Sequence, residues 1–356
     1  MKIDRRQFVQ GALATSCALA SPLRAAGPPA NGVYIGDMHS HLFFFGMGKS
    51  PDKSPLGPAM AAGNATLVAW SLVGDVPWLR ITSKGIKQKG LPKTGEASAW
   101  FESDLTRIKK HIAGQGLKIA LTPDDVDKAV SGEPHVVLTI EGATIVEDDT
   151  KPLERAYELG VRSVQLVHYI ENPLGDFQTE SPQHEGLTRL GLQVVQECNR
   201  LGILVDLAHC SDAAVRQALE ASKQPVIWSH SSVTRTRTPN WKMPVWQARQ
   251  LSFDTAKLMA EKGGVVGLWP MRSDVGATPE AYAQRLWELG EWLGDDHAAF
   301  GTDMNAISRP AIASYADLQK VVRYWQEAGF PAASIHKLAI GNYARVLTAA
   351  MSARQA

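Results

Sequence analysis

The chain has 356 residues, of which 44% are hydrophobic and 21% are charged, and its formal net charge is +1. This balance is typical of a globular protein that forms one large α/β domain or two smaller ones. The sequence contains no long basic run, so nucleic acid and anionic membrane are excluded as expected partners. No stretch has 18 uninterrupted apolar residues, so no membrane span is expected.

The N-terminal segment is predicted to be an export signal. Paired arginines, Arg5 and Arg6, precede Phe8 and an apolar run rich in Ala and Leu, and small residues follow that run. This order is typical of a twin-arginine signal with a cleavable end, and an amphipathic N-terminal helix is the alternative. We therefore expect residues 1–26 to be the signal and residues 27–356 to form a single domain. The protein is then expected to be periplasmic or secreted.

From residue 33 onward, short apolar runs alternate with segments of helical periodicity. The runs are Val33–His39, Thr66–Leu72, Val136–Glu141, Ser163–His168, Ile203–His209, Pro225–His230, Val265–Trp269 and Ala299–Asp303. Continuous apolar runs separated by helices predict a parallel sheet that is covered on both faces. Eight such units predict an α/β protein with a closed (β/α)₈ TIM barrel. A doubly wound open sheet is the competing fold.

Two of the intervening helices have predicted boundaries. The periodic segment after Thr188 can be capped by that residue, and Gly202 can end it. A second helix is expected to begin at Ser211, directly after an apolar run. The first helix thus ends just before the apolar run that begins at Ile203, and the second helix begins just after the run that ends at His209.

Polar side chains occupy the ends of these runs. The seven residues are His39, His41, Glu141, His168, His209, His230 and Asp303. Because the carboxyl ends of barrel strands converge on one mouth, these side chains are expected to lie together. Independent core histidines would have no reason to fall at the same end of successive strands. The other histidines are interpreted as solvated residues of helices or loops: His111, His135, His184, His297 and His336.

Four imidazoles and one carboxylate are more ligands than one catalytic zinc with an open position requires. We therefore predict two Zn²⁺ ions, or two other divalent metal ions, per chain. His39 and His41 are assigned to one ion, and His209 and His230 to the other. Glu141 is assigned as the carboxylate that bridges them.

Several longer segments carry a resemblance to a known family. They include "LTIEGA", "GVRSVQLVHY", the block 186–211 that ends in "VDLAHCS", and the segments "PVIWSHSS" and "FGTDMN". Between residues 34 and 347 the chain resembles the membrane (renal-type) dipeptidase family, a branch of the metal-dependent amidohydrolase barrels. The resemblance implies a (β/α)₈ barrel of the metal-dependent hydrolase type and the metal ligands named above.

The resemblance also implies catalytic and substrate-binding roles. His168 matches a histidine that polarises the scissile carbonyl, and Asp303 matches the carboxylate that relays a proton to the leaving amine. An arginine of the family grips the substrate carboxylate, and Arg249 in "ARQLSFD" matches it. Arg235 and Arg237 in "SSVTRTRTPN" are rival candidates, because the chain carries extra residues at this point.

One position departs from the family pattern. Family members usually carry His-x-Asp at the end of the first strand, whereas this chain has His41 as the second ligand. A neutral imidazole in place of a carboxylate leaves the first metal site about one charge more positive. The first metal ion is then expected to be attracted less strongly, because the ligands carry one negative charge fewer.

The resemblance implies an exported dinuclear zinc dipeptidase, in which a metal-bridging hydroxide attacks the amide carbonyl of a dipeptide. An N-acyl-amino-acid deacylase or lactonase of the amidohydrolase superfamily is the alternative, since N-acyl amino acids also carry a carboxylate beside the scissile amide. A third interpretation is a metal-binding relative without turnover, against which Asp303 and His168 argue. The sequence leaves the native metal, the substrate side chains and the formation of a homo-oligomer open.

Overall fold

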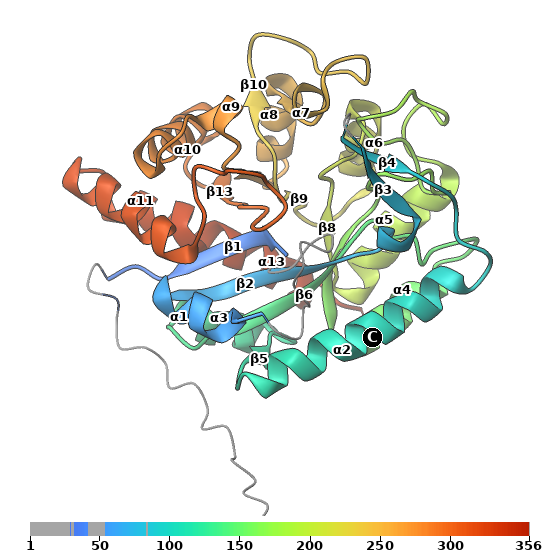
Figure 1. The fold of residues 1–356 in the computed structure, drawn as a ribbon, viewed down its shortest axis with the longest axis horizontal. Helices are drawn as coiled ribbons and strands as arrows, with labels where there is room; N and C mark the ends of the chain where they lie inside the picture. The colour runs from blue at the N-terminus through green and yellow to red at the C-terminus, as the bar shows by residue number, and fades with distance from the viewer. Residues whose placement is uncertain (1–28, 30–31, 42–53, 83–84, 356) are drawn as a thin grey trace, which may run out of the picture.

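The computed structural model describes residue 29 and residues 32–41, 54–82 and 85–355 (Figure 1). The predicted export signal, residues 1–26, lies outside the described residues. No helix within the described ranges is long and apolar enough to cross a membrane.

Eight parallel strands form the centre of the molecule (Figure 1). Their order in the sheet is β1-β2-β6-β7-β8-β9-β12-β13, with the bounds Ile35–Ser40, Ala65–Val73, His135–Glu141, Val161–Gln165, Leu204–Asp206, Ile227–Trp228, Val265–Leu268 and Ala298–Phe300. Each of them overlaps one of the eight predicted apolar runs, in the same sequence order. Parallel neighbours in chain order are what a barrel of βα units requires.

The ring closes between its last and first strands. Beyond β13, Met304 forms a parallel bridge with Ser40, and its carbonyl accepts the N–H of His41 at 3.1 Å. The N–H of Asp303 donates to the carbonyl of His39 at 2.9 Å. These contacts join the two edges, so the prediction of a (β/α)₈ TIM barrel is confirmed and the doubly wound open sheet is excluded.

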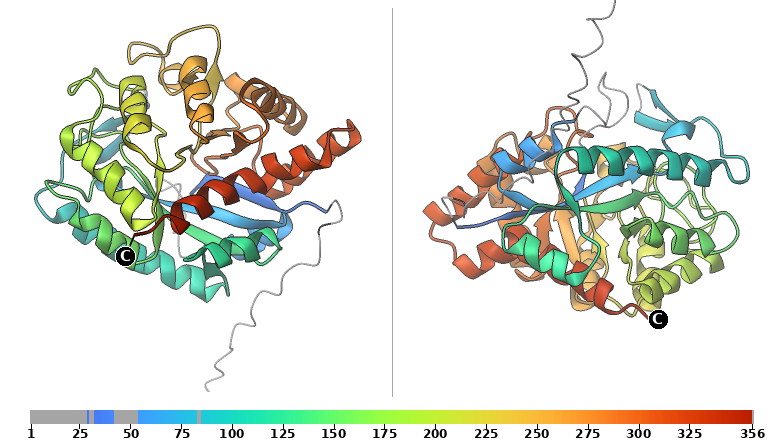
Figure 2. Two further views of the ribbon diagram at one scale, coloured as in Figure 1. Left: turned by 180° about the vertical axis from the view of Figure 1, so that it is seen from behind. Right: turned by 90° about the horizontal axis from the view of Figure 1, so that it is seen from below.

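Helices surround the strands in all views (Figures 1 and 2). Their bounds are α1 Leu56–Ala62, α2 Glu96–Gly114, α3 Pro123–Val130, α4 Lys151–Glu158, α5 Arg189–Leu201, α6 Asp212–Ala221, α7 Val245–Ala248, α8 Phe253–Glu261, α9 Arg272–Val275, α10 Pro279–Leu293, α11 Tyr315–Glu327, α12 Ala332–His336 and α13 Asn342–Ser352. A 3₁₀ turn, η2, spans Val76–Trp78, and a π-helical turn, η3, spans Lys337–Gly341.

Within the described residues, three further pairings involve short strands that are not part of the ring. The antiparallel hairpin β3–β4 joins Leu79–Thr82 to Gly85–Gln88. β10 (Val233–Thr234) pairs with β11 (Leu251–Ser252). β5 (Lys118–Ile119) pairs with the first residues of β6, at the amino end of the barrel.

Local sequence determines where α5 and α6 begin and end. The hydroxyl of Thr188 accepts the N–H of Gly191 at 3.1 Å, and Gly202 ends α5 with a φ of 75°. Ser211 caps α6 by accepting the N–H of Ala214. These three predicted boundaries are confirmed, since both caps satisfy backbone N–H groups that have no partner within the helix.

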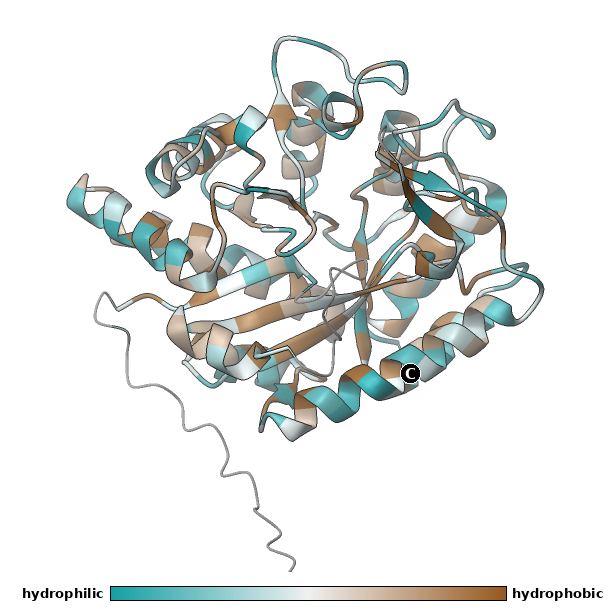
Figure 3. Cartoon of the chain, in the orientation of Figure 1, coloured by the Kyte–Doolittle hydropathy of each residue, from teal (hydrophilic) through white to brown (hydrophobic). Residues whose placement is uncertain are grey.

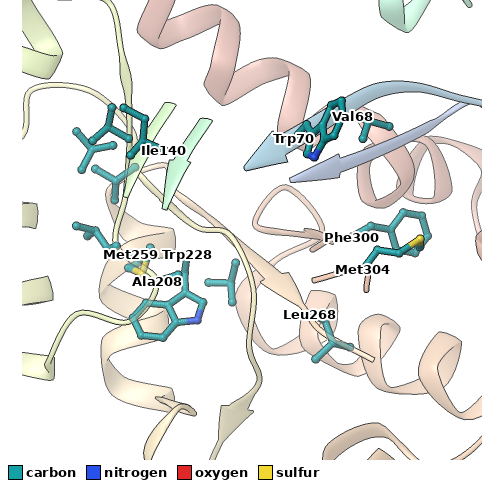
Figure 4. Close-up of a cluster of buried hydrophobic side chains, with 14 of the residues drawn as sticks. Val68, Trp70, Ile140, Ala208, Trp228, Met259, Leu268, Phe300 and Met304 are labelled. Atoms are coloured by element: carbon teal, nitrogen blue, oxygen red, sulfur yellow. The ribbon is translucent and has the colours of Figure 1, made fainter. Parts of the chain in front are cut away.

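Apolar side chains of the strands pack on both sides of the barrel wall, because successive residues face opposite sides. Val68 and Trp70 of β2 belong to the larger cluster, together with Ile140 and Phe300 (Figure 4). Leu67 belongs to a second cluster with residues of α13. Two-sided burial explains why the strands read as continuous apolar runs, and Figure 3 shows hydrophobic colours along β2 and β6.

The C-terminal helices cover one end of the barrel. α12, η3 and α13 follow one another without a break and cross the back of the molecule (Figure 2, left). Side chains of α13, among them Tyr343 and Leu347, are buried with interior residues of the strands. The amino end of the barrel is therefore filled with apolar side chains, which leaves the carboxyl ends of the strands for polar groups.

His135 corrects one sequence interpretation. It is buried and is the first residue of β6, with Nδ1 at 2.8 Å from the carbonyl of Glu133. The prediction that it is a solvated loop residue is wrong, because the strand begins one residue earlier than the apolar run. It lies at the amino end of β6, whereas Glu141 ends that strand.

Candidate active site

The carboxylate of Glu141 lies among five histidines. It is the last residue of β6, and its oxygens lie 3.2 to 3.6 Å from the Nε2 atoms of His39, His41, His168, His209 and His230. All six side chains are buried. The structure thus brings together the five residues predicted as metal ligands and adds His168 to them.

Most of these side chains stand on loops just past the strand ends. β7, β8 and β9 end two or three residues earlier than predicted, and His168, His209 and His230 follow them. His209 has a φ of 70° and Asp303 a φ of 47°. Residues other than glycine rarely adopt this left-handed conformation, and it concentrates at functional sites.

The histidines form two close pairs. Nε2 of His39 lies 3.0 Å from Nε2 of His41, and Nε2 of His209 lies 3.2 Å from Nε2 of His230. Two imidazole nitrogens at this distance share at most one proton, so the pairing suits cations placed between the nitrogens and the central carboxylate. Four imidazoles and one carboxylate match the nitrogen and oxygen ligands that zinc prefers, so the donor set fits the predicted metal.

Hydroxyl groups orient two of the rings. Nδ1 of His39 lies 3.1 Å from Oγ of Ser71, and Nδ1 of His230 lies 2.9 Å from Oγ of Ser229. Each contact holds the outer nitrogen and turns Nε2 towards Glu141, as the outer partners of metal-binding histidines do. The sequence interpretation did not identify either serine, although Ser229 directly precedes His230.

The charges in the cluster depend on one another. Burial opposes ionisation of Glu141, but the surrounding imidazoles hold the pKa of its carboxyl well below the usual range. Burial also favours neutral His41, but the carboxylates of Glu141 and Asp303 outweigh it and raise the pKa of His41 to about 10. Burial and neighbouring positive charges hold the pKa of His209 and of His230 well below the usual range. These surroundings favour the neutral, metal-binding form of His209 and His230 and the protonated form of His41.

Asp303 lies beside the first pair. Its Oδ1 is 3.4 Å from Nε2 of His41 and 4.0 Å from Nε2 of His39. One donor atom from each of these three residues lies within 4.8 Å of the others. The structure therefore places the predicted proton carrier at the edge of the cluster, within reach of a group bound there.

His168 is held by a residue that the sequence interpretation missed. Its Nδ1 donates to Oδ1 of Asp75 at 2.7 Å, while its Nε2 lies 3.4 Å from Oε1 of Glu141. Burial tends to lower the pKa of His168, but Asp75 and Glu141 outweigh it and raise that pKa. Asp75 follows the second apolar run by three residues, whereas the residues predicted at the barrel mouth, other than His41, are the last residues of their runs.

The structure distinguishes the three candidate arginines. Arg249 is buried and its Nη1 donates to Oε1 of Gln178 at 2.8 Å, while its Nε and Nη2 have no hydrogen-bond partner among the described residues. Its carbonyl accepts the hydroxyl of Ser231, the residue that follows His230, and its charge contributes to the lowered pKa of both His209 and His230.

The rival arginines are engaged elsewhere. The guanidinium of Arg235 lies over the rings of Phe253 and Trp292. Arg237 donates to Oε1 of Gln250 through Nε and Nη2, at 3.2 and 2.8 Å. Of the three, Arg249 has the geometry for an anionic group next to the histidines, because two of its donors are buried and have no partner in the described part of the chain.

A cavity of about 310 Å³ is lined by the β3–β4 hairpin and the loop after β7, and not by the histidine cluster itself. Tyr169 lines it, and the ring of Tyr169 also packs edge-on against His168 and His209, with centroid distances of 4.5 and 4.9 Å. Arg80 and Lys87 of the β3–β4 hairpin also line it. This cavity separates the hairpin from the loop that follows β7.

Comparisons with known proteins agree with this architecture. The family model described as membrane dipeptidase (peptidase family M19) matches residues 89–356. The dipeptidase tcpJ of Claviceps purpurea is 26% identical over 298 residues, which cover 81% of this chain and 67% of the relative. The dipeptidase verJ of Clonostachys rogersoniana is 32% identical over 182 residues, which cover 50% of this chain and 45% of the relative. The chain thus matches about half the length of some of its curated relatives.

Two solved structures share the fold. The metallopeptidase dipeptidase AC superposes with a TM-score of 0.74 at 22% identity, over 90% of this chain and 99% of the other. A metallopeptidase from Rhodobacter sphaeroides, solved with a phosphinate mimic of the dipeptide L-Ala-D-Ala, superposes with a TM-score of 0.72 at 21% identity. That match covers 89% of this chain and 99% of the other.

Proposed function

The chain belongs to the membrane dipeptidase family (peptidase family M19), and we propose that it is an exported dinuclear zinc dipeptidase. The observation that carries the proposal is the position of Glu141, whose carboxylate lies within 3.6 Å of Nε2 of His209 and His230 and of the His39 and His41 pair. A single carboxylate between two imidazole pairs is suited to bridging two cations.

The metal ions would be held by two sets of residues. His39 and His41 would hold one ion, His209 and His230 would hold the other, and Glu141 lies between the two pairs. When bound, the ions lower the pKa of water and so supply the hydroxide nucleophile at neutral pH.

The remaining site residues have separate tasks. Arg249 binds the substrate carboxylate through its unpaired Nε and Nη2 atoms, which fits a substrate with a free C-terminus beside the scissile amide. His168 donates to the carbonyl oxygen on which negative charge develops. Asp303 accepts the proton of the nucleophile and returns it to the departing nitrogen. Dipeptides satisfy all three requirements.

A second candidate function is hydrolysis of N-acyl amino acids or lactones. The observation that favours it is His41, whose imidazole lies in the cluster where relatives of this family usually have an aspartate. A His-x-His pair makes the site resemble other amidohydrolases. N-acyl amino acids would also offer a carboxylate to Arg249.

A substrate panel and a metal measurement test the proposal together. We expect about two metal ions per chain by elemental analysis, and faster hydrolysis of L,L- or L,D-dipeptides than of N-acyl amino acids. Arg249→Gln should raise KM for dipeptides by about 10- to 100-fold, because a buried charged hydrogen bond is lost. Preferred hydrolysis of N-acyl amino acids or lactones would favour the second candidate. A metal-loaded protein that hydrolyses nothing in the panel would contradict both.

Export is proposed on the N-terminal sequence alone. Arg5 and Arg6 precede the apolar run, so replacing both with lysine should leave the precursor in the cytoplasm. The protein without these substitutions should be cleaved within residues 20–27 and appear outside the cytoplasm. Fractionation followed by N-terminal sequencing measures both, and normal export of the double variant would contradict the proposal.

A further inference from the structure

Asp75 reaches the candidate site because the end of β2 runs directly against the end of β6. The N–H of Gly74 donates to the carbonyl of Glu141 at 2.7 Å. A Cβ atom on Gly74 would lie 2.0 Å from the carbonyl oxygen of Gly142, so only glycine allows this approach. The next residue, Asp75, is thereby placed beside the loop that carries His168.

Both carboxylate oxygens of Asp75 accept hydrogen bonds from the loop that carries His168. Oδ1 accepts from Nδ1 of His168 at 2.7 Å, and Oδ2 accepts the backbone N–H of Tyr169 at 3.1 Å. The Asp75 side chain is fully buried, where a carboxylate is costly unless hydrogen bonds satisfy it. The two bonds hold neighbouring residues of one loop, so the carboxylate restricts the imidazole ring and its backbone at once.

The hydrogen bond from His168 to Asp75 determines which ring nitrogen of His168 is directed towards the histidine cluster. Because Nδ1 is bound by Asp75, Nε2 is the atom that remains for other partners, and it lies 3.4 Å from Oε1 of Glu141. Tyr169, whose N–H the same carboxylate binds, packs its ring against His168 and His209. The ring of His168 is therefore held on two sides, with Nε2 directed towards the cluster.

We propose that Asp75 is a positioning residue for hydrolysis, which acts through His168 by binding Nδ1 and directing Nε2 towards the substrate carbonyl. This inference rests on the proposed function, since it takes His168 as the group that contacts the substrate. Charged hydrogen bonds of this kind are short and strong, and the loss of such an outer partner typically costs about 10- to 100-fold in activity.

A double-mutant cycle separates positioning from a structural role. Asp75→Ala should lower kcat by about 10- to 100-fold with KM and metal content nearly unchanged. In a His168→Ala background, the same substitution should lower kcat by no more than about twofold, because the group through which Asp75 acts is already gone. Asp75→Asn keeps the volume and an acceptor for Nδ1, and it replaces the alanine variant if that variant does not fold.

Asp176 provides the matched control. It is also a buried aspartate of the connection between β7 and α5, but it accepts the backbone N–H groups of Gln183, His184 and Gly186 and has no hydrogen bond to His168. The effect of Asp176→Ala on kcat should be the same in the wild-type and His168→Ala backgrounds. Equal losses for Asp75→Ala in both backgrounds would overturn the proposal and make Asp75 a structural residue.

NMR of histidine-labelled protein supplies a measurement that does not need turnover. The Nδ1 proton of His168, identified by its absence in His168→Ala, should be visible as a hydrogen-bonded signal and should be lost in Asp75→Ala. If no dipeptide is hydrolysed but this signal behaves as expected, the proposed function fails while the positioning contact stands. A wild-type protein without this signal would overturn the inference itself.

Discussion

Replacing Asp303 with asparagine is expected to lower kcat by about 10²- to 10⁴-fold while both metal ions are retained. Asp303 has a φ of 47°, and asparagine is one of the few residues that tolerate this conformation. The N–H of residue 303, which bonds the carbonyl of His39, also stays. The substitution therefore removes the proton acceptor and keeps the backbone that joins the last strand to the first.

Kinetics and elemental analysis on the same preparation measure this result. Asp317→Asn is the control, because it changes the charge by the same amount at the start of α11, where Asp317 accepts the N–H of Ala313 and the hydroxyl of Ser314. It should leave kcat unchanged. If Asp303→Asn keeps its metal and most of its turnover, the mechanism is wrong. If it loses one ion, Asp303 is a ligand beside His39 and His41, whose donor atoms lie within 4.8 Å of its own.

Replacing Glu141 with glutamine is expected to remove bound metal as well as activity. Glu141 is the carboxylate that these five histidines surround, and its charge would offset that of metal ions bound by them. We expect the metal content to fall from two ions per chain to one or none. The loss of kcat/KM should be about 10³-fold or more, since each catalytic ion contributes several kcal/mol to transition-state stabilisation.

Thermal unfolding gives a second readout for Glu141. A chelator should lower the Tm of the wild-type protein and zinc should restore it, because a metal that binds only the folded chain stabilises it by mass action. The Tm of Glu141→Gln should respond much less to zinc. Glu102→Gln is the control, since Glu102 pairs with Arg155 on the surface and carries the same charge. Unchanged metal binding by Glu141→Gln would exclude a bridging role.

Periodicity explains why so much of the barrel and its mouth could be predicted from the sequence. Strands buried on both faces read as apolar runs, and a polar residue that ends such a run must lie at the carboxyl end of its strand. For this reason the positions of Glu141, His209 and His230 follow from local sequence once a barrel is assumed. The caps Thr188 and Ser211 are also local, because each satisfies a backbone N–H three residues away.

The sequence by itself therefore determined the barrel, its order of strands and the residues at its mouth, but not the contacts that complete the site. Asp75 bonds His168 across 93 residues, and Gln178 accepts from Arg249 across 71. Such contacts depend on the conformations of loops, which the periodicity of the sequence does not predict. Only the tertiary structure distinguished Arg249 from Arg235 and Arg237, because burial and the pairing of guanidinium groups are properties of the packed chain.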